Sequence, residues 1–159
     1  MTEPDSFRKS ESNRAATSVR PAELPTRPKP NFSGEYRLNL ASSTLDGRAA
    51  STRAASLRID HHEPMIRIDA KFEFYGKTFA WSLQRITDGR EVVDQSDTRT
   101  RSSVRWDNDS LVFADRTDAP EVTMTWRYEL IDEGRRLKAA EQIRGAGRDQ
   151  DNVWVFDRR

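Results

Sequence analysis

The segment NFSGEYRLNL, residues 31–40, carries the first clear structural signal in this chain of 159 residues. Apolar residues and one glycine occupy every second position, with Ser, Glu, Arg and Asn between them. Because successive side chains of a β-strand point to opposite faces, this alternation predicts a strand with one buried and one solvated face. A glycine on the buried face allows a bulky neighbour or another backbone to approach closely. The expected buried positions are Phe32, Gly34, Tyr36, Leu38 and Leu40.

The same alternation continues from residue 56 to the C-terminal end, in short segments separated by turn residues. It is clearest over residues 66–74, where Ile, Ala and Phe alternate with charged side chains. Among the turn signals, Asp88-Gly89 is a strong predictor of a hairpin between the strands on either side of it. The other turns are expected at Glu63-Pro64, Tyr75-Gly76, Asp107-Asn108-Asp109, residues 132–135 and residues 145–147.

About ten predicted strands, with turns roughly every 8 to 12 residues and no crossover helices, are typical of an antiparallel all-β domain. We therefore expect an all-β fold, a single antiparallel up-and-down β-barrel of about eight to ten strands. Closing the sheet would remove its exposed edges. Residues 41–55, which are rich in Ala and Ser, form the main irregular interval, and we expect a loop there with one helical turn.

The N-terminal residues differ in composition from the rest of the chain. Residues 1–31 hold five of the seven prolines, with many Ser and Arg and few large apolar side chains. Such a segment buries too little surface to offset its conformational entropy. The predicted organisation is thus a disordered Pro/Arg/Ser-rich tail over residues 1–30, followed by one barrel domain over residues 31–159. The tail is either a solvated extension, which we favour, or an arm that covers the domain or binds a partner.

Charge and cysteine content exclude several classes of function. The chain has 27 basic and 26 acidic residues, and the two signs are interspersed, so a nucleic-acid-binding surface is not expected. There are no cysteines, which rules out disulfides, thiolate metal sites and a cysteine nucleophile. No apolar run is long enough to predict a membrane span, and the sequence as given shows no secretion signal. A cytoplasmic location is the expectation, or a secreted or periplasmic one if a leader has been removed.

The segment NFSGEYRLNLASSTLDG and the later segments IDHHEPMIRI, TDGREV, SVRWDNDSLVF, WRYELIDEGRRLKAAEQIRG and VWVFDRR resemble bacterial lipocalin-like domains. The pattern Phe-x-Gly-x-aromatic-x-Leu also resembles the first strand of the fatty-acid-binding proteins, which belong to the same calycin superfamily. The resemblance implies a barrel around a cavity for a small apolar molecule. The Arg-x-Tyr pair with which fatty-acid-binding proteins hold a carboxylate is not carried over, because Trp154-Val155-Phe156 stands there instead.

Aromatic side chains recur on the predicted buried faces. They either fill the barrel completely, as in narrow barrels, or line a cavity. We favour the cavity, with a small hydrophobic molecule as its ligand. The candidate ligand-binding residues are Tyr36, Phe72, Phe74, Phe79, Trp81, Trp106, Phe113, Met124, Trp126 and Tyr128.

Two acidic residues, Glu141 and Asp94, fall among apolar residues on predicted buried faces. A desolvated carboxylate has a raised pKa and can act as a general acid or base, but we favour a misassigned face, or pairing of the acid with Arg99, Arg101 or Arg144, as the explanation. They are the catalytic candidates of an alternative hypothesis, a cyclase or isomerase acting on an apolar substrate. His61 and His62 are adjacent, so on a strand they point to opposite faces, and no metal site is expected. No cofactor motif is present.

Overall fold

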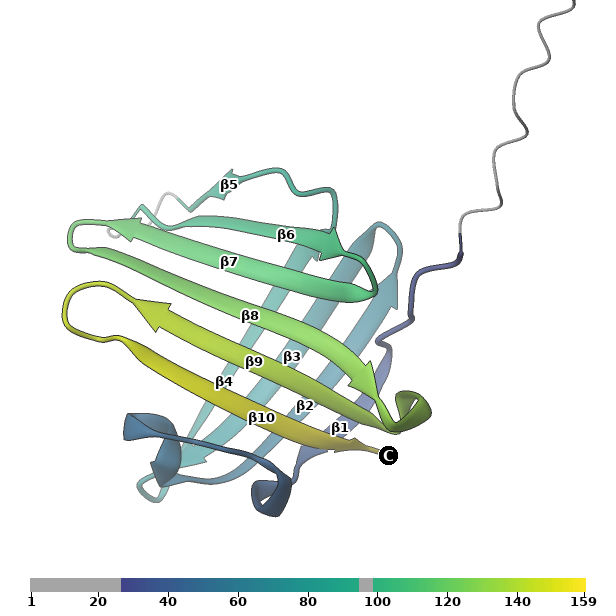
Figure 1. Cartoon of the computed structure of the whole chain (residues 1–159), viewed down its shortest axis with the longest axis horizontal. Coiled ribbons are helices and arrows are strands. Elements are labelled where there is room, and N and C mark those ends of the chain that lie inside the picture. Colours follow the sequence, from purple (N-terminus) through teal and green to yellow (C-terminus); the bar gives the residue numbers. More distant parts are fainter. Residues whose placement is uncertain (1–26, 95–98) are drawn as a thin grey trace, which may run out of the picture.

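The structure is a computed structural model that describes residues 27–94 and 99–159; the predicted tail lies almost wholly outside the described residues. The described residues form a ten-stranded antiparallel sheet, in the order β4-β3-β2-β1-β10-β9-β8-β7-β6-β5 (Figure 1). The strands are β1 (Gly34–Leu38), β2 (Thr52–His62), β3 (Met65–Phe74), β4 (Lys77–Ile86), β5 (Val92–Val93), β6 (Arg101–Asp107), β7 (Ser110–Asp118), β8 (Glu121–Ile131), β9 (Arg136–Arg144) and β10 (Gln150–Arg158). The predicted all-β, antiparallel, up-and-down architecture is confirmed.

The first strand lies at the centre of the strand order, because β1 pairs with β2 on one side and with the last strand, β10, on the other. Phe32 and Tyr36 are buried as predicted, whereas Leu40 lies beyond the end of the strand and is exposed. At Gly34 a Cβ atom would lie 2.9 Å from the Arg158 side chain on β10, so the close approach expected for this glycine is real.

Short connections match the predicted turns with one exception. Tyr75-Gly76 joins β3 to β4, and Asn108-Asp109 joins β6 to β7, both as two-residue hairpin loops. Residues 40–51 form two 3-10 turns, η1 (Leu40–Ser42) and η2 (Gly47–Ser51), and β2 begins at Thr52, four residues earlier than expected. A third 3-10 turn, η3 (Asp132–Gly134), lies between β8 and β9.

The exception is Asp88-Gly89, for which the hairpin prediction is wrong. Among the strands of the described residues, β4 pairs only with β3 and β5 only with β6, so the segment between them crosses from one edge of the sheet to the other. The Thr87 N–H donates to the Pro64 carbonyl at 2.8 Å, and the Gly89 N–H donates to the Val104 carbonyl at 2.9 Å. These long-range bonds hold the segment across one end of the sheet and prevent it from folding back as a hairpin.

The sheet therefore curls into a half-barrel whose edge strands, β4 and β5, are not hydrogen-bonded to each other (Figure 1). The closure expected from the cost of free edges is not completed in the described residues, because the crossing segment ties the two edges together at one end only. Inward side chains from β1–β3 and β7–β10 form most of the core. β4 is an edge strand, with a paired strand on one side only among the described residues. Phe79 and Trp81 on β4 are consequently 44% and 41% exposed.

Candidate functional site

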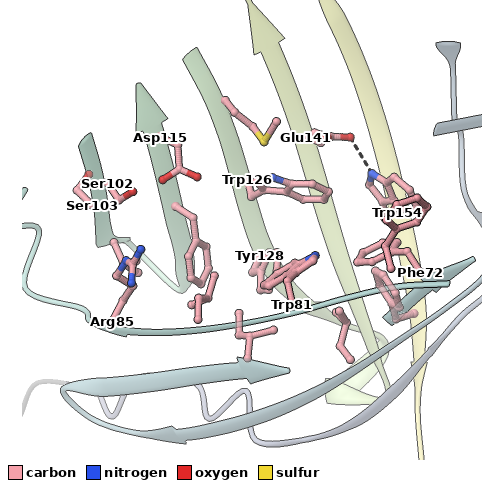
Figure 2. Close-up of a pocket in the computed structure, with 18 of the residues that line it drawn as sticks. Phe72, Trp81, Arg85, Ser102, Ser103, Asp115, Trp126, Tyr128, Glu141 and Trp154 are labelled. Carbon is pink, nitrogen blue, oxygen red and sulfur yellow. Dashed lines mark hydrogen bonds between the residues drawn. The ribbon is translucent and has the colours of Figure 1, made fainter. Parts of the chain in front are cut away.

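A cavity of about 380 Å³ lies on the concave face of the half-barrel. Its wall is mostly apolar and is formed by side chains from β2–β4 on one side and β6–β10 on the other (Figure 2). Eight of the ten predicted ligand-binding residues line it, namely Phe72, Phe74, Phe79, Trp81, Phe113, Met124, Trp126 and Tyr128. Glu141, one of the two catalytic candidates, lines it as well.

The aromatic side chains of the wall contact one another in a continuous set. Phe72 stacks on Trp81 at a centroid distance of 6.3 Å, and its ring meets Trp154 edge-on at 5.6 Å. Trp154 in turn lies 6.0 Å from Trp126. Such offset and edge-on contacts fix the orientation of each ring, so the wall presents preformed aromatic faces to the cavity.

Polar groups of the wall are concentrated at one side. Arg85 from β4, Ser102 and Ser103 from β6 and Asp115 from β7 lie together there, as Figure 2 shows, away from Trp154 and Phe72. The Arg85 guanidinium donates to the Gln84 carbonyl at 3.0 Å. The cavity thus has one aromatic side and one side with charged and hydroxyl groups.

Glu141 is the exception on the aromatic side, since it is a carboxylate only 7% exposed. In the sheet it stands opposite Trp126 of β8 and Asn152 of β10. Its Oε2 atom accepts hydrogen bonds from Asn152 Nδ2 at 2.8 Å and from Trp154 Nε1 at 3.0 Å; Figure 2 shows the second of these bonds. The alternation in β9 thus placed this acid on the inner face correctly, and its partners come from the neighbouring strand.

Tyr128 is buried on the same wall, and its hydroxyl is kept neutral. Burial raises the pKa of this phenol well above its ordinary value of 10, and the negative charge of Glu141 raises it further. Tyr128 is therefore a neutral hydrogen-bond donor at any physiological pH.

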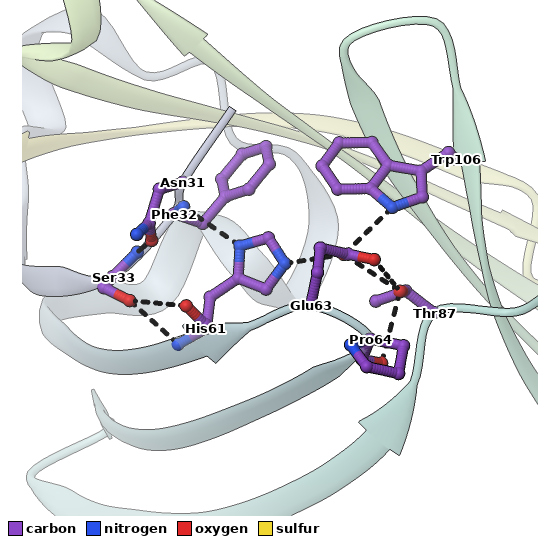
Figure 3. Close-up of polar contacts among 8 residues, drawn as sticks. All are labelled: Asn31, Phe32, Ser33, His61, Glu63, Pro64, Thr87 and Trp106. Atoms are coloured by element: carbon purple, nitrogen blue, oxygen red, sulfur yellow. Dashed lines mark hydrogen bonds and ion pairs between the residues drawn. The ribbon is translucent and has the colours of Figure 1, made fainter. Parts of the chain in front are cut away.

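Tyr36 and Trp106, the other two predicted ligand-binding residues, do not line the cavity. The Tyr36 hydroxyl donates to the Phe32 carbonyl at 2.7 Å. Trp106 Nε1 donates to Glu63 Oε1 at 3.0 Å, and its ring lies 5.8 Å from that of His61 (Figure 3). Both residues contact the segment that precedes β1, since the Trp106 ring also lies 6.1 Å from that of Phe32.

His61 is buried, and both of its ring nitrogens are used. Nδ1 accepts a hydrogen bond from the Phe32 N–H at 3.2 Å, so in the neutral ring Nε2 carries the proton and donates to Glu63 Oε1 at 2.8 Å (Figure 3). Burial by itself would raise the pKa of Glu63, but hydrogen bonds from His61, Thr87 and Trp106 outweigh it and lower this pKa. The group is a structural network that fastens residues 32–33 to β2.

The second catalytic candidate, Asp94, does not line the cavity. It follows the two-residue strand β5, is exposed, and its N–H donates to the Thr100 carbonyl at 2.8 Å. Part of the strand predicted around it, residues 95–98, lies outside the described residues. Among the described residues there is no cluster of three or more potential metal ligands, and no helix is long and apolar enough to cross a membrane.

Sequence reasoning missed two important members of the site, Trp154 and Arg85. Trp154 lies in VWVF, where apolar residues occupy both faces, so alternation could not select it. The alternation Phe79, Trp81, Leu83 along β4 does continue to Arg85, and this was the available signal.

Comparison with known proteins identifies structures with a similar fold but no sequence family. No protein-family model and no curated protein matches this chain. Among the solved structures that match this chain, three cover 80% of it as follows: the fluorescent protein UnaG (TM-score 0.59, 16% identity, 97% of that chain), the REP1-NXSQ fatty acid transporter (0.54, 13%, 96%) and a fatty acid binding protein of Schistosoma mansoni in complex with arachidonic acid (0.53, 13%, 96%). With identities this low the likeness concerns the fold alone. The chain therefore has the calycin, lipocalin-like fold of the fatty-acid-binding proteins.

Proposed function

We propose that this protein binds a small hydrophobic molecule in the cavity of its half-barrel. The observation that carries the proposal is the preformed aromatic wall of Phe72, Trp81, Trp126 and Trp154 around an open volume. A cavity of about 380 Å³ falls within the range of about 300–1,000 Å³ that is usual for small-molecule pockets. A cavity of this size forgoes the packing contacts of a filled core, and a bound apolar molecule would restore them.

The free edge of β4 offers a route of entry. Phe79 and Trp81 belong both to the cavity wall and to the exposed surface, because no strand pairs with β4 on that side. An apolar molecule that arrives at this edge meets a continuous aromatic surface from the solvent into the cavity. Two of the structural neighbours are, by their descriptions, a fatty acid transporter and a fatty acid binding protein with arachidonic acid, which agrees with such a ligand.

Titration with the neutral fluorophore N-phenyl-1-naphthylamine tests this function. We expect saturable binding of one molecule per chain and quenching of tryptophan emission, because Trp81, Trp126 and Trp154 line the cavity. Trp81→Ala should weaken binding, by about tenfold for the loss of one aromatic contact surface. Tyr75→Ala is the matched control, since Tyr75 is a 68% exposed aromatic residue of the adjacent β3–β4 loop and does not line the cavity. Absence of saturable binding, or an equal effect of both variants, would refute the proposal.

Glu141 supports a second candidate function, isomerisation or cyclisation of an apolar substrate. Its buried carboxylate adjoins the cavity, where a general acid or base would act, and the neutral hydroxyl of Tyr128 lies on the same wall. Asp94 does not line the cavity, and no observation favours it in this role. Mass spectrometry of a metabolite extract incubated with the wild type or with Glu141→Gln distinguishes the two functions. Catalysis predicts products that the variant does not form, whereas pure binding predicts an unchanged extract with both.

A further inference from the structure

Glu141 is a buried carboxylate without a cationic partner among the described residues. Its two hydrogen-bond donors, Asn152 and Trp154, are both neutral, and both bind Oε2. Neither the described hydrogen bonds nor the described ion pairs include a partner for Oε1. Arg85 is the cation of the cavity wall, and Figure 2 shows it on the opposite side of the cavity.

Two acids of the sheet that are more exposed than Glu141 do have cationic partners. Asp107 binds Arg127, and Glu129 binds both Arg127 and Lys138. A buried charge is unfavourable unless it is paired, and the penalty grows with burial. In the described structure, a positive charge or a strong N–H donor would therefore be stabilised at the Oε1 atom of Glu141.

The surroundings of Glu141 also favour a cation. It stands beside Trp126 and Trp154; Trp154 turns its N–H edge to Oε2, and both rings line the cavity, where the face of an indole can attract a cation. Tyr128 is neutral and adds no charge. The ionisable groups of the wall are then Arg85, Asp115 and Glu141, one positive and two negative. A carboxylate headgroup at this position would place two like charges together in a medium that screens them poorly.

From this arrangement we propose that the ligand is a cationic amphiphile, whose ammonium group binds Glu141 beside Trp126 and Trp154. Its hydrocarbon part lies against Phe72 and Trp81. The inference rests on the proposed binding function and adds the chemical class of the ligand. It also distinguishes this chain from a carrier of fatty acids, because the group assigned to the ligand's polar end is an anion, whereas the cation of the wall, Arg85, lies on the opposite side of the cavity.

Calorimetric titration of the full chain with three ligands of equal chain length tests the inference without any mutation. Octylammonium, octanol and octanoate each have eight carbons and carry a positive, a neutral and a negative polar end. We expect octylammonium to bind at least about tenfold more tightly than octanoate, with octanol between them, as a hydrogen bond to a charged group implies. Equal or tighter binding of octanoate overturns the inference and leaves the proposed function intact. If none of the three binds, and N-phenyl-1-naphthylamine does not bind either, the proposed function itself fails.

Glu141→Gln then locates the effect. The amide retains the size of the side chain and an oxygen that accepts from Asn152 and Trp154, so only the charge is lost. Octylammonium should bind about tenfold to a hundredfold more weakly to this variant, whereas octanol should bind as before. Glu73→Gln, at an exposed position of β3, changes the net charge by the same amount and should leave all three affinities unchanged. An unchanged preference for octylammonium in Glu141→Gln would overturn the assignment to this carboxylate.

Discussion

Replacing Phe32 by alanine is expected to destabilise the fold strongly, although this residue precedes the first strand. Phe32 is 0% exposed, and its ring lies 5.8 Å from that of His61 and 6.1 Å from that of Trp106. Its backbone N–H and carbonyl are bound by His61 and Tyr36. The side chain thus fills the end of the half-barrel, and the backbone bonds hold it there.

The magnitude follows from the side chain alone, because the backbone bonds survive the substitution. Truncation of a buried phenylalanine to alanine costs about 3–5 kcal/mol, the sum of lost transfer free energy and an unfilled cavity. This is a large fraction of the roughly 5–15 kcal/mol that stabilises a domain. With a urea m-value of about 2 kcal/mol/M, a loss of about 4 kcal/mol lowers the unfolding midpoint by about 2 M.

Urea unfolding of the full chain, followed by tryptophan fluorescence and by circular dichroism, measures this change. Phe32→Leu is the control, since it keeps most of the apolar volume and should cost less than about 1.5 kcal/mol. A loss below about 1 kcal/mol for Phe32→Ala, at an unchanged m-value, would show that this segment does not pack against His61 and Trp106.

Three further outcomes test other parts of the structure. Thr52→Val should raise the free energy of unfolding by about 1 kcal/mol in urea titrations, because the buried Thr52 hydroxyl has no hydrogen-bond partner among the described residues. If the variant is less stable than the wild type, the hydroxyl has such a partner and the prediction is wrong. Burial opposes ionisation of Glu63, but three side-chain hydrogen bonds outweigh this effect and lower the pKa of the carboxyl below 4.5. The ionised carboxylate therefore stabilises the fold above pH 4.5, and this stabilisation is lost as the pH falls through the lowered pKa. Thermal unfolding of Glu63→Gln should accordingly depend less on pH below 4.5 than that of the wild type, and parallel curves would contradict this. Gly145→Ala should lower the free energy of unfolding by more than about 2 kcal/mol, since the added Cβ would overlap the Glu121 carbonyl. Gly147 has open space around it, so Gly147→Ala should cost only about 1 kcal/mol, for its positive φ. Equal losses of the two variants in urea titrations would argue against the tight β8–β9 contact.

Much of the site was accessible from the sequence because strand alternation is a local property. The inward direction of Phe72, Trp126 and Tyr128 follows from their positions relative to neighbouring apolar residues, and the same rule placed Glu141 on the inner face. Alternation says nothing about distance along the barrel axis, however. Tyr36 shares the inner face with these residues, yet it does not line the cavity, and its hydroxyl donates to the Phe32 carbonyl.

The sequence by itself determined the antiparallel strands and most of their hairpins, since side-chain alternation and turn preferences depend on residues that are close neighbours in the chain. Tertiary structure alone decided that Asp88-Gly89 crosses between the sheet edges, because its bonding partners, Pro64 for Thr87 and Val104 for Gly89, are distant in sequence. It also decided the surroundings of Glu141, since the register of β9 against β10 brings Asn152 and Trp154 to one of its oxygens. Such partners depend on how the whole sheet pairs and curls, which no short stretch of sequence specifies.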